Sequence, residues 1–209
     1  VVTQLEAVDA GVTEINKWLN EAEGLLDNFS LQGSKETIQG QLDKHRVFFS
    51  RQLYFKSMLE TKNRIYQSLL KTSNGGEYLD MVCLQEEIKQ VNERFEEILS
   101  TASKWENKMA DSIRHWESFI DCEGEVVEWL QSAEKIFQEK TITSKSTLEM
   151  QKDFFIDAPE HLLQKVVSSG EELLKYVEEA QKKEIQSAIS NIRSRWGDVL
   201  NYAPLHLLK

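Results

Sequence analysis

Apolar residues recur at alternating steps of three and four along the stretch Tyr78–Lys140, which contains no proline and one glycine, Gly124. This spacing is typical of a helix whose apolar seam packs against partner helices. The pattern continues without interruption from Leu84 to Phe137. At 1.5 Å per residue, a helix over the whole stretch is about 90 Å long. We therefore expect a single helix that is shared by two domains.

The same spacing predicts a helix over residues 5–29 and a second one from Lys35 to Lys71. Ser34 is a suitable N-cap for the second helix, and the run Thr72–Gly76, with its two glycines, is typical of a helix end. The expected seam of this helix includes Phe48 and Phe55, and a second stripe through Val47 and Tyr54 faces outward. Phe49 and Leu53 lie between the two stripes.

The region after the long helix is less regular. Ser146-Thr-Leu-Glu149 predicts a capping box at a helix start. Pro159 predicts a kink or a restart, because proline lacks a backbone donor and clashes with the preceding turn. A further turn is expected near residues 178–184, and one unbroken helix over residues 160–202 is the alternative.

Two pairs of segments resemble each other within the chain. Residues 15–26 match residues 126–137, and residues 88–99 match residues 189–200. The repetition predicts two domains, 1–110 and 111–209, with the second half of the long helix serving as the first helix of the second domain. Ala110-Asp111-Ser112, at the joint, is expected to have few packing partners.

These repeats resemble the spectrin repeat, through a tryptophan in the first helix, an Arg-Trp-type pair in the third and a period near 106 residues. The resemblance covers the whole chain. It implies an all-α fold of two tandem three-helix, left-handed coiled-coil bundles joined by a continuous helix. It also implies aromatic core positions at Trp18, Phe95, Trp129 and Trp196. Asp43-Lys44-His45 is similar to the family's Lys-His pair, whereas Pro159 departs from its pattern.

Among such rods the chain is most similar to the nesprins, which link the nuclear envelope to the cytoskeleton. Dystrophin-like and plakin-like rods are the alternatives. The helical pattern starts at once and the first residue is not Met, so we expect a piece of a longer protein, without a signal or transit segment. The resemblance implies a cytoplasmic, cytoskeletal location, with the outer nuclear membrane reached through other parts of the protein.

Composition narrows the functional classes. The formal net charge is −10, so nucleic acid is not an expected partner. The longest apolar runs are far below the roughly 18 residues of a membrane span, so no membrane contact is expected. The two cysteines, Cys83 and Cys122, lie nearly 60 Å apart along the expected helix, roughly, too far to bond to each other. Free thiols are typical of a reducing compartment.

No constellation of catalytic residues emerges from the sequence. The four histidines are scattered, and none lies at metal-ligand spacing from a cysteine or a glutamate. There is no nucleophile elbow or phosphate-binding glycine loop. We expect no catalytic, cofactor-binding or metal-binding residues, no cofactor, and a protein that is not an enzyme.

One stretch carries more apolar and basic residues than a buried seam requires. Between Lys44 and Lys71 there are seven basic residues and one acidic residue, Glu60. An outward apolar stripe edged by positive charge is typical of a surface that receives an acidic amphipathic helix. The alternative is that the apolar residues cover the neighbouring helix and the charges are solvated. The predicted protein-binding residues are Lys44, Val47, Arg51, Tyr54, Lys56 and Met58.

These observations favour a structural function: a monomeric spacer segment of a large cytoskeletal linker, between the nuclear envelope and actin. The second hypothesis is a docking module whose partner is an acidic segment of an actin-regulatory protein.

Overall fold

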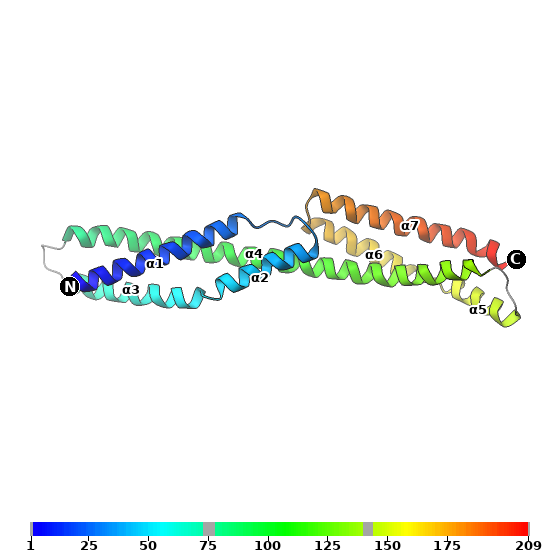
Figure 1. The fold of residues 1–209 in the computed structure, drawn as a ribbon, viewed down its shortest axis with the longest axis horizontal. Coiled ribbons are helices and arrows are strands. Elements are labelled where there is room, and N and C mark those ends of the chain that lie inside the picture. The colour runs from blue at the N-terminus through cyan, green and yellow to red at the C-terminus, as the bar shows by residue number, and fades with distance from the viewer. Residues whose placement is uncertain (1, 73–77, 140–143, 209) are drawn as a thin grey trace. The chain divides into compact units, whose positions relative to one another are not determined.

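The structure, a computed structural model, describes residues 2–72, 78–139 and 144–208, with side chains omitted at residues 2 and 78–80. The described residues are helical throughout apart from short turns, and they contain no strand (Figure 1). The elements in chain order are α1 (Val2–Asp27), α2 (Lys35–Phe49), α3 (Gln52–Thr72), α4 (Tyr78–Gln138), α5 (Lys145–Ile156), α6 (Glu160–Leu173), the 3₁₀ turn η2 (Leu174–Tyr176) and α7 (Glu179–Leu207).

The backbone contacts divide the chain into two compact units. Unit 1 comprises Val1–Ser30 and Gln39–Met109, and unit 2 comprises Leu31–Ile38 and Ala110–Lys209. Both α2 and α4 have residues in each unit, so the chain passes from one unit to the other inside each of these helices. In unit 2, the first turn of α2 is held by burial of Ile38 and by an ion pair between Lys35 and Glu117 at 3.3 Å.

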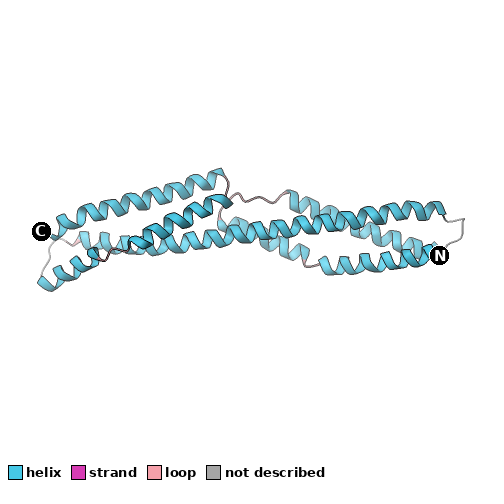
Figure 2. Ribbon diagram, turned by 180° about the vertical axis from the view of Figure 1, so that it is seen from behind, coloured by secondary structure: helices cyan, strands magenta, loops and turns pink. Residues whose placement is uncertain are grey.

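The predicted fold class is confirmed: each unit is a bundle of three helical layers, and α4 runs through both as one 61-residue helix. In unit 1 the layers are α1, α2 followed by α3, and the first part of α4 (Figure 1). In unit 2 they are the second part of α4, α5 followed by α6, and α7, as the view from behind also shows (Figure 2). The seam of α4 is buried along its length, from Leu84 through Met109 to Leu130.

The prediction of one helix over Lys35–Lys71 is wrong, because the chain leaves the helical path at Ser50 and Arg51. Phe48 and Phe49 are the last two residues of α2 and lie about 100° apart around its axis. Just before the break both rings contact Trp18: Phe48 stacks on it at 5.3 Å between centroids, and Phe49 meets it edge-on at 5.7 Å. The Ser50 hydroxyl closes the turn by donating to the Val47 carbonyl at 2.6 Å.

The expected seam holds in α3, where Phe55, Leu59 and Tyr66 are buried. Phe49 and Leu53, both expected between the seam and the outward stripe, differ: Phe49 is 9% exposed and Leu53 is 74% exposed. Phe48, expected on the seam, is only half-buried. The expected helix end at Thr72–Gly76 begins with the last residue of α3, and its remaining residues lie outside the described part of the chain.

Unit 2 starts its middle layer two residues earlier than predicted. The N-cap of α5 is Ser144, whose hydroxyl accepts from the Thr147 amide at 3.1 Å, so the capping box predicted at Ser146–Glu149 is wrong. The interruption predicted at Pro159 is confirmed, since α5 ends at Ile156 and α6 begins at Glu160. The alternative of one helix over residues 160–202 is excluded by η2 and by extended backbone at Val177.

The expectation that Ala110–Ser112 has few packing partners is also wrong. The Ser112 side chain is fully buried, and its Oγ donates to the carbonyl of Tyr176 at 3.1 Å. Ile113 and Trp116, on the following turn, are buried as well. These residues are packed into unit 2.

Two contacts recur at corresponding places in the units. Trp129 stacks on Phe154 at 5.2 Å, as Trp18 stacks on Phe48, and in each unit the helix breaks shortly after the Phe-Phe pair. In addition, an arginine of the third layer pairs with a glutamate of the first. The pairs are Arg94 with Glu23, at 2.8 Å, and Arg195 with Glu134.

Candidate docking surface

The six predicted binding residues lie along α2 and α3 of unit 1. Lys44 and Val47 belong to α2, Arg51 lies at the break, and the other three belong to α3. All are exposed except Met58, which is half-buried. The exposed fraction reaches 73% for Val47 and 53% for Tyr54. The exposed Leu53, which sequence reasoning did not include, is also part of this surface. We call these seven residues the α2–α3 surface.

Arg51 and Tyr54 are brought together. The guanidinium carbon of Arg51 lies 5.8 Å from the centroid of the Tyr54 ring and 5.1 Å from that of Phe55. Tyr54 meets Phe55 edge-on at 5.0 Å between centroids. These distances are typical of cation–π and aromatic contacts. The cation at the centre of the surface is therefore held against the buried Phe55.

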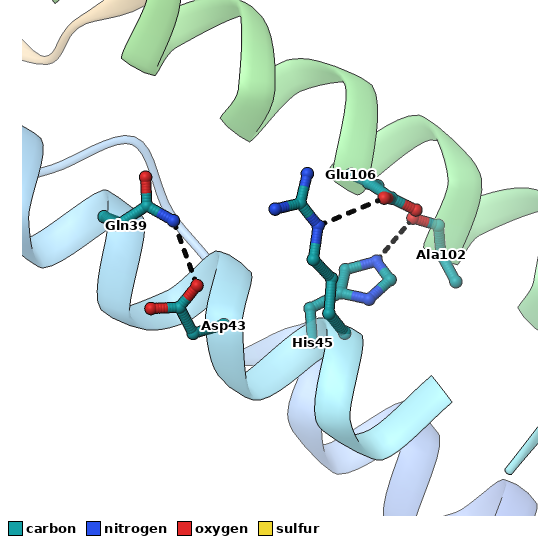
Figure 3. A network of polar contacts seen from close by, with 6 residues as sticks. Gln39, Asp43, His45, Ala102 and Glu106 are labelled. Atoms are coloured by element: carbon teal, nitrogen blue, oxygen red, sulfur yellow. Dashed lines mark hydrogen bonds and ion pairs between the residues drawn. The ribbon is translucent and has the colours of Figure 1, made fainter. Parts of the chain in front are cut away.

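Within the described part of the chain, the two lysines of the surface have no partner comparable to the aromatic rings beside Arg51. Lys44 and Lys56 form no hydrogen bond or ion pair with another described residue. Among the basic residues of this stretch, Arg46 pairs with Glu106 of α4 at 3.4 Å (Figure 3). The positive charge that remains on the α2–α3 surface therefore comes from Lys44, Arg51 and Lys56.

Beneath this surface, His45 is a buried polar group with 2% of its surface exposed. Its ring stacks on Phe29 at 5.5 Å and contacts Phe49 at 4.7 Å. Nε2 lies 2.7 Å from the carbonyl oxygen of Ala102 (Figure 3), and because a carbonyl only accepts, Nε2 carries the proton. Burial lowers the pKa of His45, against the opposing effect of Glu106 and together with the repulsion of Arg46. The neutral imidazole is thus the form that the fold favours.

The four predicted core aromatics all lie in the bundle interiors, to different depths. Trp18 and Phe95 are 3% exposed and Trp196 is 7% exposed, whereas Trp129 is only half-buried. Trp18 contacts Phe55 at 4.7 Å and Phe95 at 5.9 Å between centroids. Trp129 contacts Trp196 at 4.9 Å.

No group of three or more His, Cys, Asp or Glu side chains in the described residues is placed to hold a metal ion. Within the same residues, no helix is both long enough and apolar enough to cross a bilayer. Cys83 is exposed, Cys122 is buried, and both are free thiols.

Neighbouring substitutions should separate the α2–α3 surface from the core. We expect Phe55→Ala to lower the free energy of unfolding by about 3–5 kcal/mol, because it opens a cavity under Trp18. Tyr54→Ala removes an exposed ring and one cation–π contact, so its expected cost is about 1 kcal/mol or less. Urea unfolding of both variants checks this. A larger loss for Tyr54→Ala than for Phe55→Ala would show that Tyr54 is the core residue.

Acid should weaken unit 1 through His45. The pKa of His45 is lowered in the folded chain from its ordinary value of 6.5. Below that value the unfolded chain takes up the proton more readily than the folded one, so the free energy of unfolding falls as the pH falls from about 6.5. We expect His45→Gln to reduce this pH dependence, since Gln151 lies buried at the corresponding place in unit 2. Urea titrations between pH 7.5 and 5.5 measure the free energy of unfolding of the intact chain and of His45→Gln. An equal change with pH in both proteins would contradict the assignment to His45.

No family model matches the chain. Over 206 residues, 99% of its length, the chain is 39% identical to Muscle-specific protein 300 kDa of Drosophila melanogaster. Over 123 residues, 59% of its length, it is 27% identical to Spectrin alpha chain, erythrocytic 1, of Mus musculus. The chain spans only about 2% of the first relative and 5% of the second.

The tandem helical bundles and the similarity to these two proteins together support the conclusion that the chain is part of a spectrin-like repeat protein.

Proposed function

We propose that the chain is a spacer segment of the rod of a large cytoskeletal protein, and that units 1 and 2 are two of its repeats. The observation that carries the proposal is that α4 belongs to both units without an intervening loop. A helix common to two bundles passes tension from one to the other through its own backbone. The small share of each relative that the chain spans supports a place within a much longer protein.

We further propose that this rod links the nuclear envelope to the actin cytoskeleton, with its membrane and actin attachments outside these 209 residues. The resemblance to the nesprins supports this assignment over a dystrophin-like or a plakin-like rod. The segment acts as a monomer in this role.

Exchange of the segment in cells tests the spacer function. The longer protein that contains the chain is expressed intact, without the segment, or with two spectrin repeats of unrelated sequence in its place. A spacer requires length and continuity, so the unrelated repeats should restore nuclear positioning to the level of the intact protein. Failure of the unrelated repeats, where the natural segment succeeds, would reject a pure spacer.

The second candidate function is a docking site for an acidic segment of an actin-regulatory protein. It is favoured by the exposure of Val47, Leu53 and Tyr54 around the Arg51 cation. Aromatic and arginine side chains dominate the binding energy at interface centres. Lys44 and Lys56 would form the rim, where charge mainly alters the association rate and its salt dependence.

The same cellular assay distinguishes the two functions. The double variant Arg51→Glu with Tyr54→Ala alters the α2–α3 surface and leaves the buried seam in place. A spacer carrying this variant should position the nucleus normally. Loss of positioning, with unchanged thermal unfolding of the purified variant, would assign the function to docking.

A further inference from the structure

Unit 2 has a groove between α4 and α7 that is separate from the α2–α3 surface. One hollow, of about 470 Å³, is lined by Phe137, Val199, Tyr202 and Leu205 together with polar neighbours. A second hollow, of about 330 Å³, is lined by residues nearer the start of α7, including Ser187 and Asn191. Arg195 lines both hollows, and we call them together the α4–α7 groove.

The corresponding arginine of unit 1, Arg94, has its donors occupied by α1. Its Nε donates to Glu23 at 2.8 Å, one terminal nitrogen donates to Asn16 at 3.2 Å, and the other donates to Asn20 at 2.5 Å. The bond from Arg94 lowers the pKa of Glu23. In unit 1 the arginine at this place is thus paired with a carboxylate and two amide oxygens.

Arg195 has only part of that set. One of its terminal nitrogens donates to Glu134, and the described residues provide no other acceptor for it. The residues that correspond to Asn16 and Asn20, 111 positions later, are Val127 and Gln131. Valine has no side-chain acceptor, and Gln131 is exposed and forms no bond with Arg195. The remaining donors of Arg195, a residue whose side chain is 29% exposed, are left in the groove.

The end of the groove near the C-terminus of α7 carries apolar side chains, whereas the corresponding positions of unit 1 carry polar ones. Leu205 is 59% exposed and Tyr202 is 39% exposed. The residues 101 positions earlier, at the same place in unit 1, are Lys104 and Thr101. Exposed apolar side chains beside a hollow are typical of an interaction surface.

The charges around Arg195 are mostly negative. Glu134 and Asp198 line the larger hollow, and Glu123, whose pKa is raised by burial, lines the smaller one. The groove follows α7 from Ser187 to Leu205. At 1.5 Å per residue, that stretch matches an occupying helix of about 18 residues.

We propose that the α4–α7 groove binds a basic amphipathic helix of a partner protein. The apolar face of that helix enters the hollow beside Leu205, and its basic residues pair with Asp198 and Glu123. An Asn or Gln side chain of the same helix supplies Arg195 with the amide oxygen that α1 supplies to Arg94 in unit 1. This partner is basic, whereas the partner expected at the α2–α3 surface is acidic.

A selection from displayed peptides tests this site. A library of helical 18-residue peptides, with randomised surface positions, is panned on the intact 209-residue chain. We expect the enriched peptides to be basic, to carry Asn or Gln at one fixed position of the apolar face, and to bind less tightly as salt increases. Acidic peptides, if they are enriched as well, report on the α2–α3 surface. Enrichment that yields no basic peptides would overturn the proposal.

Two variants then locate the bound peptide. Leu205→Ser should weaken binding at least tenfold, whereas Leu200→Ser, at an exposed leucine of α7 that lines neither hollow, should leave the affinity unchanged. The double variant Val127→Asn with Gln131→Asn rebuilds the acceptors of unit 1, so it should weaken binding at least tenfold while Arg195 remains. Circular dichroism confirms folding of each variant. Equal affinity for the intact chain, Leu205→Ser and the double variant would contradict the site.

Discussion

Replacement of Trp18 by Ala is expected to destabilise unit 1 by about 3–5 kcal/mol, one of the largest effects of any single substitution in the chain. The Trp18 side chain is 3% exposed and contacts aromatic rings from each of the other layers: Phe48 and Phe55 stack on it, and Phe95 lies tilted at 5.9 Å between centroids. Its removal leaves a cavity that these rings cannot fill without moving from their helices. Urea unfolding, followed by the hydrogen exchange of α1 amides, reports on unit 1 directly.

Trp129→Ala is the matched control in unit 2. Trp129 is half-buried and stacks on Phe154 and Trp196, so its removal opens a shallower space and should cost less. A loss at Trp18 no larger than the loss at Trp129 would contradict the central place assigned to Trp18.

Replacement of Ser112 by Pro should be comparably severe, at about 3 kcal/mol or more. Proline removes the backbone donor of residue 112 inside α4 and clashes with the preceding turn. It also removes the hydroxyl that donates to Tyr176, within the fully packed part of unit 2. We expect the unfolding transition of unit 2 to move to lower urea and to separate from that of unit 1.

Ser112→Ala separates the two causes. It removes only the hydrogen bond to Tyr176, which is worth about 1 kcal/mol, and it leaves the backbone of α4 unchanged. A Pro variant that unfolds like the Ala variant would show that α4 is already interrupted at this point.

The features that the sequence predicts best are those set by a repeating local pattern. The seam of α4 follows steps of three and four over its whole length, so both its existence and its continuity across the two units are predictable. The interruption at Pro159 is predictable for an equally local reason, since proline cannot continue a hydrogen-bonded helix.

The break at Ser50–Arg51 has no local signal in the sequence. No glycine or proline marks it, and it directly follows Phe48 and Phe49, whose rings both contact Trp18. The recurrence of a Phe-Phe pair at Phe154-Phe155, 106 residues later, was the available clue to this packing. The prediction of the α5 N-cap was wrong for a different reason: Ser144 and Ser146 are equally suitable caps by residue type, and the structure uses Ser144.

The α2–α3 surface also combines features that periodicity predicts with features that depend on side-chain packing. Period-based reasoning identified the exposed positions of α2 and α3, but it missed Leu53. The period of α3 itself places Leu53 on the outer face, because it lies two residues, about 200°, from the buried Phe55. The contact of Arg51 with the rings of Tyr54 and Phe55 depends on side-chain conformation at the break, which no periodicity specifies. The unmatched donors of Arg195 became visible only by comparison with the three acceptors of Arg94.

Hydrogen exchange across Trp105–Trp116 tests most directly whether the two units share one helix. Amides inside a continuous helix exchange only when the helix opens, so this segment should exchange as slowly as the flanking parts of α4. Exchange at Trp105–Trp116 markedly faster than in the flanking turns of α4 would contradict a continuous α4, and with it the proposed transmission of tension through the segment.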